Sequence, residues 1–229
     1  MERVFLFLLP ELHFTKSDLN ISNSSKRPVI GTLARMITNA IFLSHSLREE
    51  LTIQIFIEKP ESHIFTIQSN TIRYLGPELR SSGSILLKAE DAVKKKIESE
   101  LFADQEWFQP HRGLLARFQQ KPLDNFIAQV KSFHCFIFHK EGTSFPFDLP
   151  SSNFFNGLEE LLKRHANACE MLFFVFSLGQ LSLEKLLAPV LGEKQRITTI
   201  SLTQNLDFPQ AINIINVILD QFEEEKKTL

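Results

Sequence analysis

Side chains suited to holding phosphate groups are concentrated in one short stretch, NTIRYLGPELRSSGSILLKA, which runs from residue 70 to residue 89. Arg73, Tyr74 and Arg80 lie there between a strand-like segment and an apolar, helix-like segment. Guanidinium groups bind phosphates through paired hydrogen bonds, and unpaired bases stack on guanidinium planes. The stretch is therefore a candidate for binding a phosphate-bearing ligand.

Two more arginines, Arg35 and Arg48, fall at or next to expected element ends, where α/β sheets open ligand clefts. The competing interpretation is surface ion pairing, which is common and weak. The carboxylates available for it are Glu49, Glu50 and Glu78. For any single arginine the ion pair is the simpler explanation, whereas four arginines at such positions together favour a ligand site.

The sequence lacks the motifs of several large enzyme classes. It contains no G-x-S-x-G, no G-x-x-x-x-G-K-[ST], no H-E-x-x-H and no C-x-x-C, so hydrolase, P-loop and zinc sites have no support and no metal site is expected. Ser44 and His45 are adjacent, but neighbouring residues on a helix do not face each other. The sequence assigns no catalytic nucleophile and no proton acceptor.

The composition predicts a globular protein in a reducing compartment. The chain has 229 residues, of which 43% are hydrophobic, and no apolar run approaches the ~18 residues of a membrane span. Its two cysteines, Cys135 and Cys169, lie in or beside apolar segments and are expected to be buried thiols in a cytoplasmic protein. Because the net charge is −2, any binding of nucleic acid requires a local basic patch.

Short β-rich runs alternate with longer helical runs, which predicts an α/β fold. The expected strands are residues 3–9, 52–58, 63–67, 135–139, 171–177 and 196–201. The expected helices are residues 32–45, 82–101, 123–131, 156–166, 182–191 and 208–225. Several strands are apolar at every position, the pattern of strands that are covered on both faces. Residues 20–28 and 151–157 are expected loops, too short to be domain linkers, so residues 1–229 are predicted to form one domain.

The last helix is apolar around most of its circumference. Starting at Pro209, it reads PQAINIINVILDQFEEE, which is too apolar for a single amphipathic stripe. Asp207 is suited to cap its start, and Pro209 to occupy its first turn. Such a helix either lies inside the fold or packs against a second copy of the molecule.

Two segments resemble a known family. Residues 34–58 contain R-x(6)-F-L-S-H-x-x-R, and residues 72–89 contain R-Y-L-x-P-E-x-R-S. Both patterns, in this order and spacing, are similar to those of the archaeal tRNA pseudouridine N1-methyltransferases of the SPOUT superfamily, relatives of the Nep1-type ribosomal RNA methyltransferases. A thinner similarity continues through HRGLLARF and FHKEG to the last helix.

The resemblance implies a mostly parallel sheet flanked by helices, with a deep trefoil knot at about residues 135–229. It implies that the knot loops hold S-adenosyl-L-methionine, largely through backbone groups, and that a homodimer forms through the C-terminal knot helices. The positions of the donor site carried over to this sequence are Phe138, Gly179, Ser201, Leu202, Thr203, Gln204, Asn205, Leu206 and Ile212. The RNA-binding residues would be Arg35, Arg48, Arg73, Tyr74 and Arg80.

The function implied by the resemblance is N1-methylation of pseudouridine in the T-loop of tRNA. Two alternatives stay open. Where relatives read S-L-G-P, this chain has Ser201, Leu202, Thr203 and Gln204, which favours a protein that binds RNA without methylating it. The third possibility is a ribosomal RNA substrate on the same scaffold.

Overall fold

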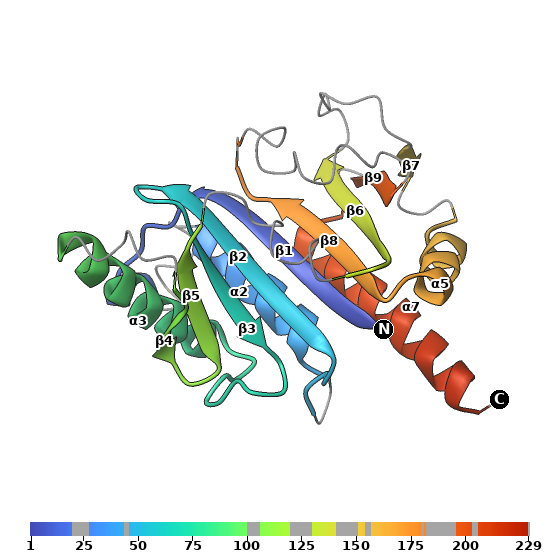
Figure 1. The fold of residues 1–229 in the computed structure, drawn as a ribbon, viewed down its shortest axis with the longest axis horizontal. Coiled ribbons are helices and arrows are strands. Elements are labelled where there is room, and N and C mark those ends of the chain that lie inside the picture. Colours follow the sequence, from blue (N-terminus) through green and yellow to red (C-terminus); the bar gives the residue numbers. More distant parts are fainter. Residues whose placement is uncertain are drawn as a thin grey trace.

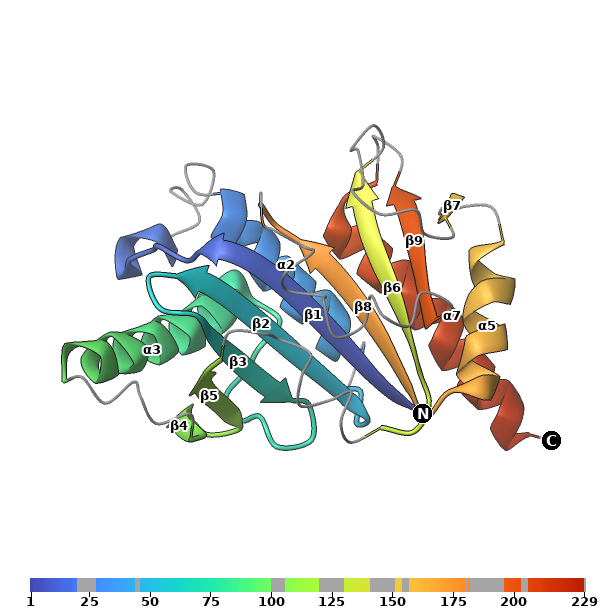
Figure 2. The ribbon, with the colours of Figure 1, turned by 45° about the horizontal axis from the view of Figure 1, so that its top comes forward.

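A computed structural model gives the fold of the chain (Figures 1 and 2). It describes residues 1–19, 28–43, 46–99, 106–119, 130–140, 151–153, 157–179, 181, 196–202 and 206–228. The predicted helix at 182–191 lies outside the described residues. Of the predicted helix at 123–131, only Val130 and Lys131 are described, and they are not helical. Residues 20–27, Ser44 and His45 also lie outside the described residues.

The described strands form one nine-stranded sheet in the order β4-β5-β3-β2-β1-β8-β6-β9-β7. In chain order they are β1 (Glu2–Glu11), β2 (Leu51–Lys59), β3 (His63–Gln68), β4 (Phe108–His111), β5 (Leu114–Phe118), β6 (Phe133–Lys140), β7 (Ser151–Asn153), β8 (Met171–Ser177) and β9 (Ile197–Leu202). Strands β2, β1, β8, β6, β9 and β7 pair in parallel, whereas β3, β5 and β4 pair antiparallel. The predicted α/β fold with a mostly parallel sheet is confirmed.

Four α-helices of the described chain cover one face of this sheet (Figures 1 and 2). They are α2 (Pro28–Ile41), α3 (Leu79–Glu98), α5 (Leu158–Ala168) and α7 (Phe208–Lys227), and a short 3-10 helix, η1 (Lys16–Leu19), follows β1. Contacts between α3 and α2, α2 and α7, and α7 and α5 join the helices into one layer. No helix among the described residues is long and apolar enough to cross a membrane.

The core occupies both faces of the sheet. In β1, Phe5 and Phe7 enter the cluster under the helices, and the alternate residues Leu6 and Leu8 enter a second cluster on the opposite face. All four side chains are fully buried. Alternate residues of a strand point to opposite faces, so a strand buried on both sides must be apolar throughout, as the sequence RVFLFLL is.

The sequence placed most elements within a few residues of their observed bounds. Helix α2 departs most from its expected position. It begins at Pro28 and ends at Ile41, so both of its ends lie about four residues before the expected ones. Three strands were not predicted: β4, β5 and β7. β7 corrects the expectation that residues 151–157 form only a loop. Both cysteines are free thiols, as predicted, and burial raises the pKa of Cys135 to about 12.

Candidate functional site

The carboxyl ends of β8, β6 and β9 meet at one edge of the sheet, called here the donor edge. Phe138 of β6 is level with Phe176 of β8 and Ile200 of β9, so the last residues of these three strands lie side by side. Gly179, Ser201 and Leu202 come directly at or after the strand ends. In open α/β sheets, ligands bind outside the carboxyl ends of parallel strands. The structure therefore brings these three predicted residues to one edge.

Four predicted donor-site residues, Phe138, Leu202, Leu206 and Ile212, have buried side chains. The Phe138 ring is 2% exposed and stacks on Phe176 at 4.6 Å between ring centroids, with 8° between the planes. Ile212 is fully buried in the cluster under the helices, and Leu206 is 7% exposed. Their side chains shape the core, so only their backbone groups are candidates to contact a ligand. Thr203, Gln204 and Asn205 lie outside the described residues.

Gly179 is confined by the strand beside it. A Cβ atom there would lie 2.7 Å from Cδ of Pro10, so a larger residue requires the chain to move. The Ser177 hydroxyl donates a hydrogen bond to the carbonyl oxygen of Gly179 at 2.9 Å, and the amide of Leu178 donates to the carbonyl of Leu8 at 2.8 Å. These contacts fix the turn after β8 against β1.

The start of α7 lies next to the donor edge, and five residues separate it from the end of β9. As predicted, Asp207 caps this helix, and it forms a reciprocal capping box with Gln210. Arg35 of α2 pairs with the Asp207 carboxylate at 3.2 Å, and its side chain is 60% exposed. Of the five residues predicted to bind RNA, Arg35 is therefore the one that lies beside the donor edge.

Arg48 lies at the opposite end of the sheet, inside the protein. Its Nη1 atom donates hydrogen bonds to the carbonyl oxygens of Asn39, Ala40 and Phe42, which end α2. Its Nε atom donates to Asp220 of α7 at 2.9 Å. Only 9% of the side chain is exposed. Arg48 therefore caps α2 and ties it to α7, and its assignment to an RNA surface stays a prediction.

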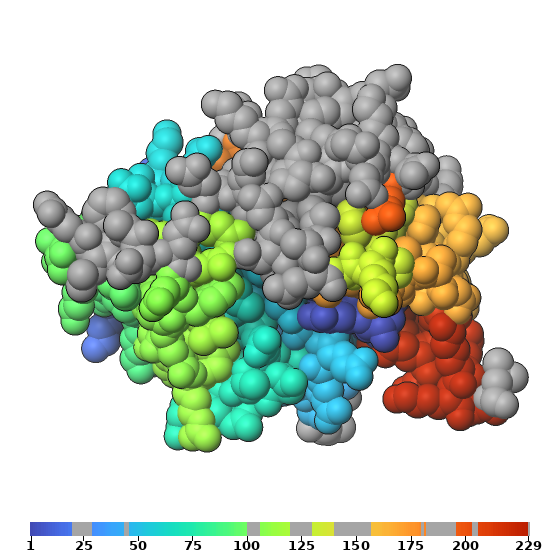
Figure 3. Space-filling model, in the orientation of Figure 1, coloured from blue at the N-terminus to red at the C-terminus, as the bar shows by residue number. Residues whose placement is uncertain are grey.

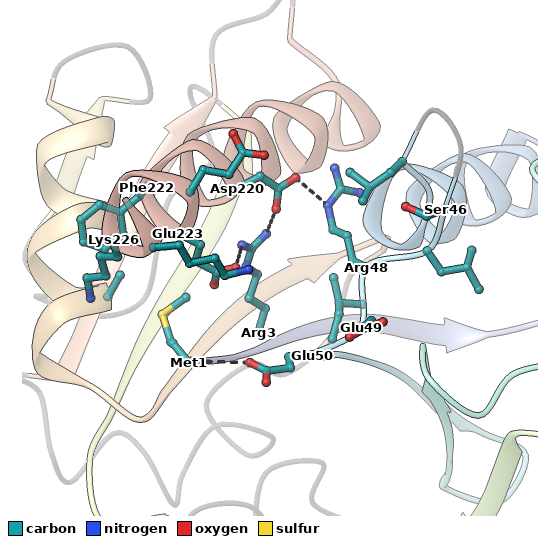
Figure 4. A pocket seen from close by; sticks show the side chains of 16 residues that line it. Met1, Arg3, Ser46, Arg48, Glu49, Glu50, Asp220, Phe222, Glu223 and Lys226 are labelled. Atoms are coloured by element: carbon teal, nitrogen blue, oxygen red, sulfur yellow. Dashed lines mark hydrogen bonds and ion pairs between the residues drawn. The ribbon is translucent and has the colours of Figure 1, made fainter. Parts of the chain in front are cut away.

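Arg3, which the sequence analysis did not single out, belongs to the same ion network (Figure 4). Its guanidinium contacts Asp220 at 2.5 Å, Glu223 at 3.0 Å and the Asn216 side chain at 3.1 Å. A cavity of about 630 Å³ opens beside these groups, between the amino ends of β1 and β2 and the last turns of α7. One signal was visible in the sequence: Arg3 is a charge at the head of an otherwise apolar strand.

Arg73 and Tyr74 lie far from the donor edge. β3 runs antiparallel to β2, and its last residue, Gln68, pairs with Thr52 near the amino end of β2. The chain therefore leaves β3 at the end of the sheet opposite the donor edge. Arg73 donates to the carbonyls of Asn70 and Ile72 at 3.3 and 3.0 Å, and both Arg73 and Tyr74 are exposed.

Arg80 is exposed in the first turn of α3. The segment before it crosses back under the sheet, where the Thr38 hydroxyl of α2 contacts the Pro77 carbonyl at 3.4 Å. A few residues further on, Gly83 abuts Leu19, which follows β1. The five predicted RNA-binding residues are thus spread over the molecule, and Arg48 is the buried one.

A pair of stacked histidines forms a second polar cluster that the sequence analysis missed. His134 of β6 is 4% exposed, shares a hydrogen bond of 2.9 Å with the Thr198 hydroxyl, and stacks on His165 at 3.6 Å. Burial, with smaller contributions from His165 and Arg164, lowers the pKa of His134 to about 3. Among the described residues, no group of three or more His, Cys, Asp and Glu is placed to hold a metal ion.

His134 is expected to make the fold sensitive to acid. In the unfolded chain it takes up a proton below its ordinary pKa of about 6.5, whereas in the folded chain it stays neutral down to about pH 3. Within that window the unfolded state binds more protons, so the free energy of unfolding should fall by about 2 kcal/mol between pH 7 and pH 5. Urea denaturation of wild type and His134→Asn at both pH values measures this. An equally steep fall in the variant would refute the assignment to His134.

Comparison with known proteins gives partial matches. The chain is 37% identical over 59 residues to a tRNA (pseudouridine(54)-N(1))-methyltransferase of Methanococcoides burtonii, which covers 25% of this chain and 29% of that protein. It is 28% identical over 68 residues to the protein of the same name from Haloarcula marismortui, which covers 30% and 33%. The matched segments thus span about a third or less of these relatives. No family model matches the chain.

Among solved structures, one match is the crystal structure of Archaeoglobus fulgidus Nep1 bound to S-adenosylhomocysteine. The TM-score is 0.45 and the sequence identity is 13%, and the match covers 99% of this chain and 100% of the Nep1 chain. The sequence matches confirm that this chain, over part of its length, resembles the tRNA (pseudouridine(54)-N(1))-methyltransferases.

Proposed function

We propose that the protein is an S-adenosylmethionine-dependent RNA methyltransferase that methylates N1 of a pseudouridine in the T-loop of tRNA. The observation that carries this proposal is the 37% identity over 59 residues to the Methanococcoides burtonii protein of that name. The two arginine-bearing patterns, Arg35 to Arg48 and Arg73 to Ser81, support it from the sequence. We further propose a cytoplasmic, single-domain protein.

The donor edge is the proposed binding site of S-adenosylmethionine. The described residues fit such a ligand in one respect: three parallel strands end there together, and backbone groups of Gly179, Ser201 and Leu202 follow them. The knot proposed for residues 135–229 would add the residues between Leu202 and Leu206. When bound, the donor supplies an electrophilic methyl group on a sulfonium centre.

The protein's own residues would hold the RNA in place for this transfer. Arg35 lies beside the donor edge and is exposed, so it is the proposed phosphate contact nearest the reacting base. Arg80, in the first turn of α3, would hold the RNA further out. Holding a flipped pseudouridine with N1 in line with the methyl group is the main contribution required of the protein, because orientation alone lowers a barrier substantially. No side chain is assigned as the proton acceptor.

A homodimer is proposed through the C-terminal helices. On α7, Ile214, Val217 and Ile218 form an apolar row that is not fully buried, and Val217 is 45% exposed. Ile214 and Ile218 also line a groove between α7 and α5, together with Glu159, Lys163 and Arg164. A second copy packed on this row would complete the burial that the apolar sequence of α7 predicts.

The proposed function is tested by titrating the full chain with S-adenosylmethionine in a calorimeter, followed by mass analysis of tRNA incubated with both. The expected results are saturable donor binding and a T-loop fragment heavier by one methylation. Methylated ribosomal RNA with unchanged tRNA would favour the alternative substrate. RNA binding without donor binding would favour a non-catalytic RNA-binding protein, and loss of both would refute the proposal.

Arg35→Ala is the matched variant for this assay, with Lys227→Ala in the last turn of α7 as the control. Arg35 should be needed for methylation because it lies beside the donor edge. Lys227 is exposed and lies about 28 Å along α7 from the start of that helix, which is next to the donor edge. Equal methylation by wild type and Arg35→Ala would remove Arg35 from the proposed site.

A further inference from the structure

The chain contains a single tryptophan and a single tyrosine among 22 phenylalanines, and both are on the surface. Tyr74 is 82% exposed and Trp107 is 42% exposed. The largest fully buried side chains, in contrast, are all phenylalanine or leucine. The core therefore contains phenylalanine and no tyrosine or tryptophan, and the Tyr74 ring contributes little of the burial that normally stabilises an aromatic side chain.

Tyr74 is held in a backbone conformation that disfavours it. Its φ angle is +61°, the left-handed region that glycine and asparagine adopt readily and bulky residues rarely do. The turn is nevertheless well fixed, because the Ser81 hydroxyl donates to the Tyr74 carbonyl at 3.0 Å and accepts from the Gly76 amide at 2.7 Å. Strain of this kind is concentrated at functional sites. A tyrosine that is both exposed and strained does not stabilise the fold, so its presence at position 74 points to a role in binding.

The β4–β5 hairpin lies against the Tyr74 turn. The amide of Arg73 donates to the carbonyl of Arg112 at 3.4 Å, and the Tyr74 ring meets the His111 ring edge-on at 6.3 Å between centroids. In Figure 3 the yellow-green hairpin and the blue-green chain after β3 lie side by side at the lower left of the visible face. The turn at the end of the hairpin and the turn after β3 thus form one surface.

Trp107 lies at the start of the same hairpin, four residues before His111. The guanidinium of Arg117, on the neighbouring strand β5, lies over the indole ring at 4.6 Å. At ~3.3 Å per residue, Trp107 and His111 are about 13 Å apart along the strand. A stacked single strand at ~3.4 Å per nucleotide covers that length with about four nucleotides.

The charge of this surface favours RNA as the occupant. Residues 70–74 and 106–118 carry three arginines, Arg73, Arg112 and Arg117, against one acidic residue, Glu106. Over the whole chain the net charge is −2, so the surface is locally basic. Exposed aromatic rings that alternate with arginines are the means by which proteins hold single-stranded nucleic acid, since bases stack on the rings and phosphates pair with the guanidinium groups.

We propose that Tyr74 and Trp107, with Arg73, Arg112 and Arg117, form a platform for unpaired RNA bases outside the methyl-transfer site. The inference rests on the proposed function for its choice of RNA. β4 is five strands away from β8 in the sheet, or about 24 Å at ~4.8 Å per strand. The platform would therefore hold nucleotides distant from the methylated one and contribute to RNA affinity without taking part in the reaction.

Because Trp107 is the only tryptophan, its fluorescence reports directly on this surface. The full chain is titrated with a single-stranded oligouridine RNA of about eight nucleotides and with an abasic ribose-phosphate strand of the same length. The expected result is quenching of Trp107 by the first and not by the second, with tighter binding of the first. Equal affinity for the two strands and no quenching would refute stacking.

Three variants test the residues by fluorescence anisotropy of labelled RNA. Trp107→Ala should weaken binding between about fivefold and a hundredfold, the usual effect of losing one stacked base. Tyr74→Asn should also weaken binding while its melting temperature stays equal or rises, because asparagine tolerates the left-handed region. Leu43→Ala is the control, since Leu43 is 41% exposed on the turn after α2. If Trp107→Ala and Tyr74→Asn bind as tightly as Leu43→Ala, the platform is wrong.

The test of the platform can be distinguished from the test of methyl transfer. If the protein methylates tRNA, Trp107→Ala should raise the KM for tRNA and leave kcat unchanged, because the residue is remote from the donor edge. Base-dependent quenching without methyl transfer would support the platform and reject the enzyme. Methyl transfer with unaltered KM and affinity in both platform variants would support the enzyme and reject the platform.

Discussion

Replacing Asp220 by alanine is expected to lower the free energy of unfolding by about 3 to 5 kcal/mol. One oxygen of this carboxylate contacts Arg3 at 2.5 Å and the other contacts Arg48 at 2.9 Å. The two arginine side chains are only 4% and 9% exposed. Without Asp220, two guanidinium groups stay buried close together with less countercharge, and an unpaired buried charge is far more costly than an exposed one.

The network matters because it joins three separate parts of the fold. Arg3 is the second residue of β1, Arg48 precedes β2 and caps α2, and Asp220 lies on α7 (Figure 4). Asn216, one turn before Asp220, donates to the carbonyls of Asn39 and Ala40 at 3.1 and 3.2 Å and so supplies further partners for the end of α2. Loss of Asp220 should therefore loosen α7 from α2 as well as unpair the arginines.

Urea denaturation of Asp220→Ala measures the effect, and Glu223→Ala provides the comparison. Glu223 contacts the same Arg3 at 3.0 Å, but its side chain is 39% exposed. Its loss should cost less than about 1 kcal/mol, as for exposed ion pairs. Equal losses of stability in the two variants would show that Asp220 acts only as a surface carboxylate.

The sequence identified the central strands well because their burial on both faces leaves a simple pattern. β8 was predicted with its observed bounds, Met171–Ser177, from the run MLFFVFS. β4 and β5 were missed for the opposite reason. β4 reads FQPH, and β5 alternates buried and half-buried residues in LLARF, so neither gives a long apolar run. These are the two outermost strands at one side of the sheet, where strands are less completely buried, and this explains the weaker pattern.

The candidate site was only partly predictable, because spacing in the sequence does not show which end of a sheet a residue reaches. Arg48 and Arg73 both stand next to strand ends in the sequence. Arg48 precedes β2 and is buried, whereas Arg73 follows β3, which is reversed relative to β2, and is exposed at the same end of the sheet. The spacing of the arginines in the sequence shows neither that β3 runs antiparallel to β2 nor that Arg48 is buried. In contrast, the cap at Asp207 is a local feature, and it was predicted correctly.

Gly113→Ala is expected to lower the free energy of unfolding by about 3 kcal/mol, through overpacking and backbone strain together. Gly113 has a φ angle of +81° in the turn between β4 and β5, and a Cβ atom there would lie within 2.5 Å of backbone atoms of Ile72 and Thr71. Backbone atoms cannot rotate away as the end of a side chain can. The hairpin must therefore shift from the turn that carries Tyr74.

Thermal denaturation followed by Trp107 fluorescence measures this change, because Trp107 begins the same hairpin. Gly31→Ala is the matched control: Gly31 is inside α2, and a Cβ there meets nothing within 4 Å. Alanine is the better helix former, so this variant should gain about 0.5 to 1 kcal/mol. The two glycine substitutions should thus shift the melting temperature in opposite directions. A Gly113→Ala protein as stable as wild type would mean that the hairpin does not pack against the chain after β3, and the RNA platform would then lose the contact that joins its two halves.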